Sequence, residues 1–381
     1  MKRKFIVIKI KKIFSILLFF LILMILFISS KLNFNTIKKT TELFIYNVFP
    51  SLFLFALFTE FILNTQIINT ISNKLGIILN KIFPISKHSS IVILIGFLCG
   101  FPNGAKTIIS LLDENKITKK QANFLLFFNN NCNPIFIFST IGISFFNNNS
   151  IGYLLLICHF FSSVLIGICA SIIYIHNIIH EKTDFLNTFE QKTYFKDKKI
   201  PIFENLKLSM KKSFMTLLNI FGFMIIFSIV SENISLLLNS FIKNQNLIKI
   251  ITSPFEITTG IFNILNIDKT LEFKLILTSF LLGFSGICII AQIYSVINSK
   301  HFSLNLLIIS KIIHGVFSSI ICFILLKLNI FNIYNELQTF ANNEIHSYTF
   351  TNNFTLLFYI IIFILASVVF LKNIIHIKKN S

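Results

Sequence analysis

The chain has few charged residues, which make up only 13% of its 381 positions. A soluble domain carries about 25%. Apolar residues account for 54%, with 48 Phe among the aromatics, and the mean hydropathy is +0.79. One globular core cannot bury this much apolar surface. The scarcity of charge therefore excludes a soluble domain and indicates that the lipid bilayer surrounds most of the chain.

Arginine is almost absent, because Arg3 is the only one. The lysines behind the net charge of +19 lie mostly in short polar gaps between apolar runs, where they orient membrane helices. No Arg-rich nucleic-acid surface is present, so nucleic acid is not an expected partner. The cysteines form no CxxC pair, so neither a disulfide framework nor a zinc site is indicated, and small buried apolar residues are predicted. They are Cys99, Cys132, Cys158, Cys169, Cys288 and Cys322.

Motifs of soluble enzymes are missing as well. The chain has no GxSxG, HExxH, Walker or GxGxxG sequence. An enzyme and ATP coupling within this chain are therefore not expected. No cofactor or metal site is predicted, and the sequence specifies neither a coupling ion nor an oligomeric state.

Long apolar runs are what the chain has instead. They exceed the ~10-residue alternating segments of a membrane barrel, and lipid admits only helices or closed barrels. The expected fold class is an all-α integral membrane protein of about eight to ten membrane segments. The spanning candidates are 13–29, 42–63, 91–112, 151–175, 213–231, 273–297, 304–328 and 355–371, with weaker segments at 67–86 and 234–264.

The distribution of lysine predicts orientation and organisation. Basic residues precede the first apolar run and no small-x-small cleavage site follows it, so an uncleaved helix with a cytoplasmic N-terminus is expected. Segment 176–212 carries eight Lys, whereas 329–354 has neither Lys nor Arg. The predicted parts are an N-terminal helix (1–30), a first membrane repeat (31–175), a cytoplasmic linker (176–212), a second membrane repeat (213–328), and an outside loop with a C-terminal helix (329–381).

Two pairs of segments suggest that the membrane repeats are inverted. Phe49–Glu60 aligns with Phe221–Glu232, and Gly96–Lys106 aligns with Gly283–Gln292 after one gap. The orientations predicted from lysine make the matched segments run in opposite directions. Two inverted repeats with broken or re-entrant helices are typical of secondary transporters.

A helix break is predicted in the segment GFLCGFPNGAK. Pro102 cannot donate a backbone hydrogen bond, and Gly100 and Gly104 weaken the helix around it. The freed amides from Asn103 onward and the charge of Lys106 together favour an anion site at membrane depth. The alternative is a GxxxG packing face with a proline kink and a lysine that reaches the membrane surface.

A second break is predicted where polar residues split the apolar segment 118–146. Asn129, Asn130 and Asn131, followed by Cys132-Asn133-Pro134, need hydrogen-bond partners in an apolar setting. Each half is too short to span alone. A re-entrant hairpin allows the chain to reach the cytoplasm at residue 176, as the lysines require. It nevertheless leaves loop 113–120, with three Lys, on the outside. An ordinary polar loop between two helices is the alternative.

Isolated polar residues inside apolar stretches are further candidates, since ionisable groups in membrane segments are costly. Glu60 lies near a helix end, and Glu256 follows the helix-breaking Ser253-Pro254. Gln292 lies in the last matched segment. Lys311 and His314 are one turn apart and are both able to face an anion.

The segments GFPNGAK, NNNCNP, SPFEITTG, LLGFSGICIIAQ and SKIIHG occur in this order between residues 42 and 328. They resemble sporulation integral membrane proteins of the YlbJ type, which carry a nucleoside-recognition ("Gate") domain related to concentrative nucleoside transporters. Cys132-Asn133 departs from the small residue and Gly frequent in that family. The matching positions are Gly100, Pro102, Gly104, Lys106, Asn129, Asn130, Pro134, Glu256, Gly260, Gly283, Gly286, Gln292 and His314.

The resemblance implies a multi-pass protein of the outer forespore membrane that moves dipicolinate, a small anion, and is needed for spore cortex formation and maturation. The expected function is therefore a transporter whose substrate contacts the matching positions other than Gly260, together with Asn103 and Asn131. The alternatives are a nucleoside or related small-molecule carrier and a membrane scaffold without transport activity in cortex assembly.

Overall fold

The structure, a computed structural model, describes residues 29–65, 89–180, 200–297 and 304–329, together with 74, 76–77, 79, 82–83, 302 and 331. The two terminal helices predicted from the sequence lie outside these residues. Every regular element in the described part is helical, which confirms the all-α fold class. Five segments there are long and apolar enough to cross a membrane: Ser30–Leu63, Asn149–Ile172, Ile202–Asn239, Leu271–Val296 and Leu304–Lys327.

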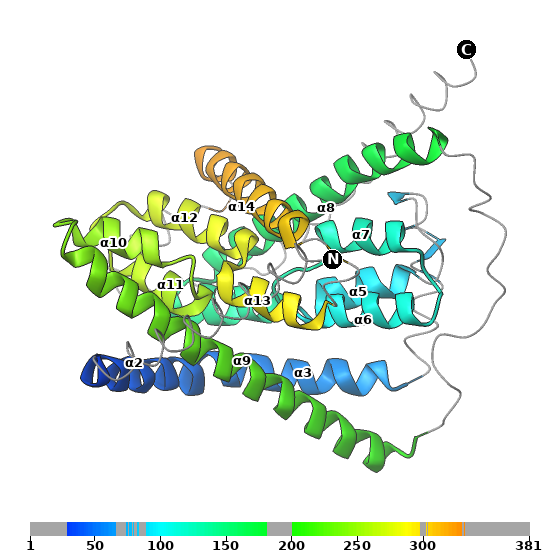
Figure 1. Cartoon of the computed structure of the whole chain (residues 1–381), viewed down its shortest axis with the longest axis horizontal. Helices are drawn as coiled ribbons and strands as arrows, with labels where there is room; N and C mark the ends of the chain where they lie inside the picture. Colours follow the sequence, from blue (N-terminus) through cyan, green and yellow to red (C-terminus); the bar gives the residue numbers. More distant parts are fainter. Residues whose placement is uncertain are drawn as a thin grey trace, which may run out of the picture.

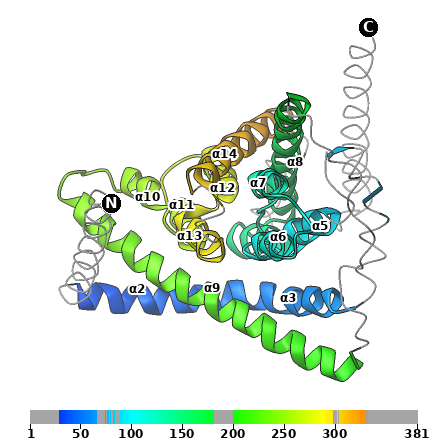
Figure 2. The same cartoon turned by 45° about the vertical axis from the view of Figure 1, so that its right-hand side comes forward.

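The first crossing segment pairs with the first helix of the second half. α2 (Ser30–Leu43), the π-helical η1 (Phe44–Val48) and α3 (Phe49–Leu63) follow one another and lie against α9 (Ile202–Asn239). Asn233 Nδ2 donates to Asn33 Oδ1 at 2.7 Å, and Asn64 Nδ2 donates to Asn205 Oδ1 at 2.9 Å. The two segments are therefore antiparallel, and they form a layer beneath the other helices (Figures 1 and 2).

The helices on either side of the predicted linker extend into the segment 176–212. α8 (Asn149–His180) continues to residue 180, and α9 begins at Ile202, so lysines 207, 211 and 212 lie on its first turns. These lysines are exposed. Charged side chains end an apolar run without ending a helix, because their stems lie along the helix surface and their heads reach water.

The segment predicted to span at 91–112 is a hairpin instead. α5 (Ser90–Leu98) and α6 (Asn103–Asp113) lie side by side (Figure 1). A Cβ on Gly104 would lie 3.1 Å from Gly96 Cα, so the two arms touch through glycine. The predicted break between them is confirmed, but both ends of the segment lie on the same side. We call residues 99–102 the first tip.

The segment 118–146 crosses the bundle as one interrupted helix. α7 (Lys119–Phe128) and the π-helical η3 (Phe136–Phe145) pack successively along α8. A Cβ on Gly142 would lie 2.4 Å from Gly152 Cα, and Ser163 Oγ donates to the Phe128 carbonyl at 2.8 Å. Gly152 of α8 thus meets Gly142, whereas Ser163, later in α8, meets the earlier residue Phe128. The segment 118–146 and α8 are therefore antiparallel. We call residues 129–133 the first break.

The segment 91–112 is thus the hairpin, and the segment 118–146 is the crossing, the reverse of what the sequence predicted. This exchange removes the conflict over the side on which loop 113–120 lies. A hairpin returns to the side on which it begins, so loop 113–120 and its three lysines fall on the predicted cytoplasmic side. The α7–η3 crossing then runs outward and α8 returns. The re-entrant reading of 118–146 was therefore wrong, because neither half needs to span alone when η3 continues the line of α7.

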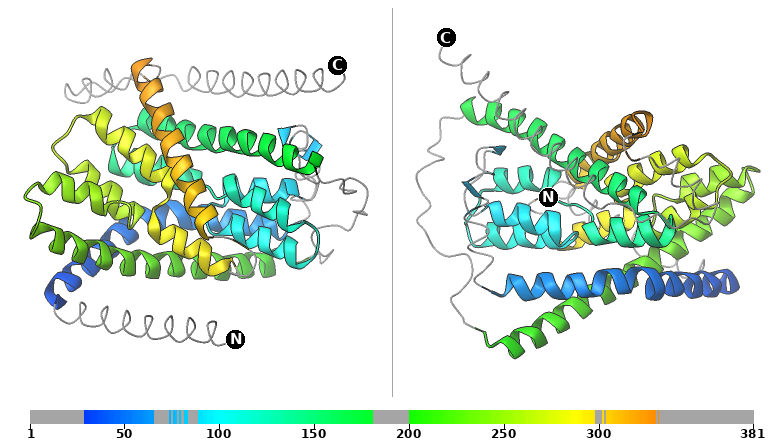
Figure 3. Two further views of the ribbon diagram at one scale, coloured as in Figure 1. Left: turned by 45° about the horizontal axis from the view of Figure 1, so that its top comes forward. Right: turned by 180° about the vertical axis from the view of Figure 1, so that it is seen from behind.

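The second half has the same order of elements. α10 (Gln245–Thr252) and α11 (Ile257–Leu265) form a second hairpin, in which Lys249 Nζ donates to the Asn266 carbonyl at 2.8 Å. α12 (Leu271–Phe284) and α13 (Gly286–Val296) form a second interrupted crossing, followed by α14 (Leu304–Lys327), which crosses α12 (Figure 3). We call residues 253–256 the second tip and residues 285–288, where α12 ends and α13 begins, the second break.

The element order changes the alignment of the repeats. Gly96–Lys106 belongs to a hairpin, whereas Gly283–Gln292 belongs to an interrupted crossing, so the two are not equivalent. Both segments contain closely packed glycines, which is why they matched. Gly283, however, packs on Gly315 of α14, where a Cβ would lie 2.8 Å from Gly315 Cα. The inversion itself stays a prediction.

Labelling from the two sides of the membrane tests this topology. In a chain whose native cysteines are replaced, Lys119→Cys, at the start of α7, should react with an impermeant thiol reagent only from the cytoplasm. Lys269→Cys, between the second hairpin and α12, should react only from outside, because it is separated from Lys119 by an odd number of crossings. Labelling of both positions from one side would contradict the arrangement.

Candidate functional site

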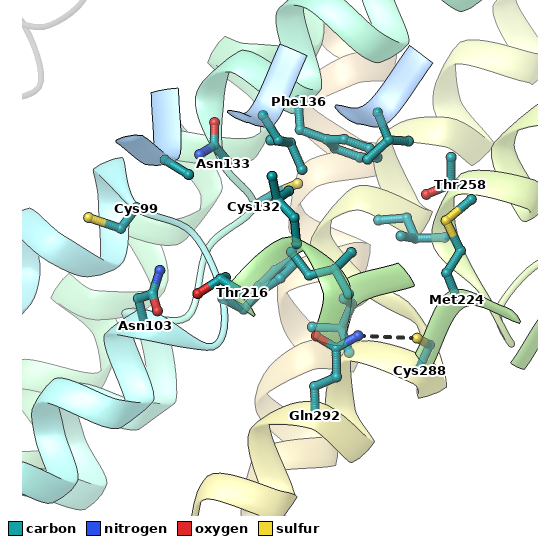
Figure 4. Close-up of a pocket in the computed structure, with 18 of the residues that line it drawn as sticks. Cys99, Asn103, Cys132, Asn133, Phe136, Thr216, Met224, Thr258, Cys288 and Gln292 are labelled. Carbon is teal, nitrogen blue, oxygen red and sulfur yellow. Dashed lines mark hydrogen bonds between the residues drawn. The ribbon is translucent and has the colours of Figure 1, made fainter. Parts of the chain in front are cut away.

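A pocket lies where both tips and both breaks meet α3 and α9. Figure 4 shows side chains from both halves of the chain around it. α3 and α9 close one side, and the first tip and first break face the second tip and the start of α13. Irregular backbone at membrane depth is tolerated only in such a place, where protein or a cavity surrounds it.

The first tip is hydrogen-bonded to the first break. Phe101 donates its backbone N–H to the Asn131 carbonyl at 3.1 Å. Gly100 has φ of +70°, and a Cβ there would lie 2.9 Å from the Asn133 nitrogen. Glycine is required because the chain must turn in a left-handed conformation while its backbone touches that of the break.

The second tip is held in the same manner. Ile287 and Cys288 donate their backbone N–H groups to the carbonyls of Pro254 and Phe255, at 2.8 and 3.0 Å. Gly286 has φ of +77°, and a Cβ there would lie 3.2 Å from the Pro254 oxygen. The amides freed where α13 begins are thus satisfied by carbonyls that no helix uses.

The asparagine cluster is buried inside the first break. The side-chain Nδ2 groups of Asn129, Asn130 and Asn131 donate to the carbonyls of Val92, Leu126 and Phe128, at 2.6, 3.2 and 3.3 Å. Their side-chain oxygens have no hydrogen-bond partner in the described structure. Asn129 and Asn130 face the glycines of α5 and α6, so they join the break to the hairpin and do not line the pocket.

The two carboxylates that line the pocket both have positive partners. Glu256 caps α11 and accepts the N–H groups of Thr258 and Thr259, at 3.1 and 2.7 Å, and the Thr259 hydroxyl at 2.9 Å. A helix N-terminus stabilises such a charge. Glu60 on α3 lies 3.7 Å from Lys212 Nζ on α9. No Lys, Arg or His is among the described lining residues.

A buried basic cluster lies behind the first break. Lys311 Nζ donates to the Asn130 carbonyl and lies 5.4 Å from the centroid of the Phe101 ring. His159 Nε2 accepts the Cys132 N–H at 2.9 Å, and His314 Nε2 lies 2.9 Å from the His159 carbonyl. α14 and α8 therefore support the break from the side opposite the pocket.

The structure brings only some of the predicted site residues to the pocket. Asn103, Glu256 and Gln292 line it. Lys106 is exposed on α6 and is not among the lining residues, so the structure gives its predicted anion site no support. The others shape the tips and breaks or lie behind them: Gly100, Pro102, Gly104, Asn129, Asn130, Asn131, Pro134, Gly283, Gly286 and His314.

Several lining residues were not singled out by sequence reasoning. Cys132 and Cys288 face the pocket from the two interrupted crossings, and Gln292 Nε2 lies 3.4 Å from Cys288 Sγ (Figure 4). α9 contributes Ser213 and Thr216. A signal for α9 was present, because its buried residues recur at helical spacing and are mostly small and polar: Asn205, Ser209, Ser213, Ser228 and Ser231.

Metal ligands are not gathered anywhere in the described part of the chain, where no group of three His, Cys, Asp or Glu side chains forms. The six cysteines are free thiols. The chemistry available at the pocket is therefore hydrogen bonding by amides, hydroxyls and carboxylates around apolar side chains. This composition suits the binding of a small metabolite.

The sequence of the chain is similar to that of a known protein. The chain is 29% identical over 304 residues to "Sporulation integral membrane protein YlbJ" of Bacillus subtilis (strain 168), and the match covers 74% of each chain. The chain is a relative of the YlbJ-type proteins. Neither a family model nor a solved structure matches it. Together with its apolar helices, this relationship makes the YlbJ-like chain a multi-pass integral membrane protein.

The second break provides a test of the site's construction. Gly286→Ala places a side chain on a residue in the left-handed conformation, which costs roughly 1–2 kcal/mol. The added methyl group also presses against the second tip. We expect a lower melting temperature of the purified protein in detergent. Gly222→Ala is the matched control, because a Cβ there would meet nothing within 4 Å. Equal melting temperatures for the two variants would show that the tip and the break do not touch.

Proposed function

We propose that the chain is a transporter that carries a small planar metabolite through the pocket between the two tips, with dipicolinate as the first candidate substrate. The observation that carries the proposal is the pocket itself, to which both hairpins and both interrupted crossings contribute. Its place of action would be a membrane of a sporulating cell, the outer forespore membrane being the first choice, in support of cortex formation.

The architecture supports transport more than a scaffold role. Secondary transporters bind substrate near the middle of the membrane, between broken helices of two repeats, and then move one part against the other. Here α3 and α9 face the tips across the pocket, so relative movement of these two layers would expose the pocket to one side and then the other. A scaffold has no need of a polar pocket at this depth.

The lining suits a flat ring with polar substituents. Leu52, Ile220 and Met224 offer apolar surface, while Asn103 and Gln292 offer amide donors. Dipicolinate has a pyridine ring and two carboxylates, so its ring matches the apolar part and its oxygens match the amides. The name of the Bacillus relative, which refers to sporulation, favours this substrate over others.

A nucleoside is the second candidate, and one observation favours it. The described lining contains amides, hydroxyls and carboxylates but no cationic side chain, and this set pairs readily with the neutral base and hydroxyls of a nucleoside. The two candidates differ in charge, so a direct comparison of binding separates them.

Binding to the purified chain and uptake into vesicles test the proposal. Gln292→Met removes a buried lining amide while keeping the volume of the side chain. We expect a roughly ten- to hundredfold loss of dipicolinate affinity, because a hydrogen bond to a charged group contributes about 1.5–3 kcal/mol. Gln245→Met, outside the pocket on α10, should bind like the unaltered chain.

The outcomes distinguish the candidates. Binding and uptake of nucleosides without dipicolinate would replace the first candidate by the second. Absence of uptake for both classes, in vesicles that contain folded protein, would contradict a transport function.

A further inference from the structure

Lys311 is buried in the middle of α14 and only 3% of its surface is exposed. Its ammonium donates to the Asn130 carbonyl in the first break and lies over the ring of Phe101 in the first tip. Phe101 and the neighbouring Cys132 both line the pocket. The ammonium is therefore separated from the pocket by one layer of side chains.

The charge of Lys311 has no acidic partner in the described part of the chain. None of the ion pairs formed there includes it. The two carboxylates of the pocket are already compensated, Glu256 by the start of α11 and Glu60 by Lys212. A buried ammonium that lacks a counter-charge is costly, so the site favours the arrival of an anion.

The two neighbouring histidines are not required to carry charge. His159 Nε2 accepts a hydrogen bond from the Cys132 N–H, so this nitrogen bears no proton. His314 Nε2 lies at hydrogen-bond distance from the His159 carbonyl and therefore donates, which the neutral ring can do. Lys311 is thus the residue through which this cluster carries a positive charge when protonated.

We propose that Lys311 is the residue that selects an anionic substrate in the pocket, by supplying the positive charge that the lining itself lacks. Its field acts through the wall formed by Phe101 and Cys132, where the low dielectric of the protein interior strengthens it. A carboxylate that enters the pocket becomes the counter-ion of Lys311. This proposal rests on the proposed function and names the basis of its substrate class.

The chain contains a matched control for this charge. Lys106 was the lysine expected from the sequence to bind the anion, yet it is exposed on α6 and does not line the pocket. Replacing either lysine by methionine removes one charge and keeps the length of the side chain. Only the replacement at Lys311 changes the charge behind the pocket.

Two probes of equal shape and different charge make the test specific. Dipicolinate is a dianion, and pyridine-2,6-dicarboxamide is its neutral counterpart. For purified full-length Lys311→Met we expect a roughly ten- to hundredfold loss of dipicolinate affinity and an unchanged affinity for the dicarboxamide. Lys106→Met should leave both affinities unchanged. If Lys311→Met fails to fold, Lys311→Gln keeps a donor for the Asn130 carbonyl and should show the same selective loss.

The possible failures are distinguishable. An equal loss of affinity for both probes in Lys311→Met would assign Lys311 a purely structural role. Unchanged affinities for both would show that its charge does not act on the pocket. Either result overturns this proposal but leaves the proposed transport function intact. An unaltered chain that binds the dicarboxamide but not dipicolinate would also overturn it. An unaltered chain that binds neither probe would overturn this proposal together with dipicolinate as the substrate.

Discussion

The structure depends on one type of interaction, the backbone hydrogen bonds between re-entrant tips and interrupted helices. A membrane offers no water to satisfy an unwound segment, so each break must find partners within the protein. Phe101 supplies an N–H to the first break, and Pro254 and Phe255 supply carbonyls to the second. The first tip donates an N–H and the second tip accepts through carbonyls, yet each arrangement joins one hairpin to one crossing.

From these contacts follows the position of the pocket. Because the tips end where the crossings are interrupted, polar groups that a continuous helix would hide are gathered at one depth between the tips and the α3–α9 layer. The lining carboxylates are offset locally, while the buried ammonium of Lys311 is not. The charge at the site therefore comes from behind its wall and not from the residues that face it.

The sequence predicted the breaks better than the path of the chain. Gly100, Pro102 and the asparagine cluster break a helix by local chemistry that is visible in one segment. Whether the arms beyond a break return or continue depends on packing, as between Gly96 and Gly104 or between Gly142 and Gly152, which apolar length does not reveal. The approach of Lys311 to Asn130 joins residues 181 positions apart, so no local pattern contained it.

The most direct measurement of the central claim is protection of a native cysteine by substrate. In a chain that keeps only Cys288, which lines the pocket, dipicolinate should slow alkylation by N-ethylmaleimide. In a chain that keeps only Cys169, which is exposed on α8 away from the pocket, the rate should not change. Equal rates at Cys288 with and without dipicolinate, under conditions in which dipicolinate binds, would contradict a binding site between the two tips.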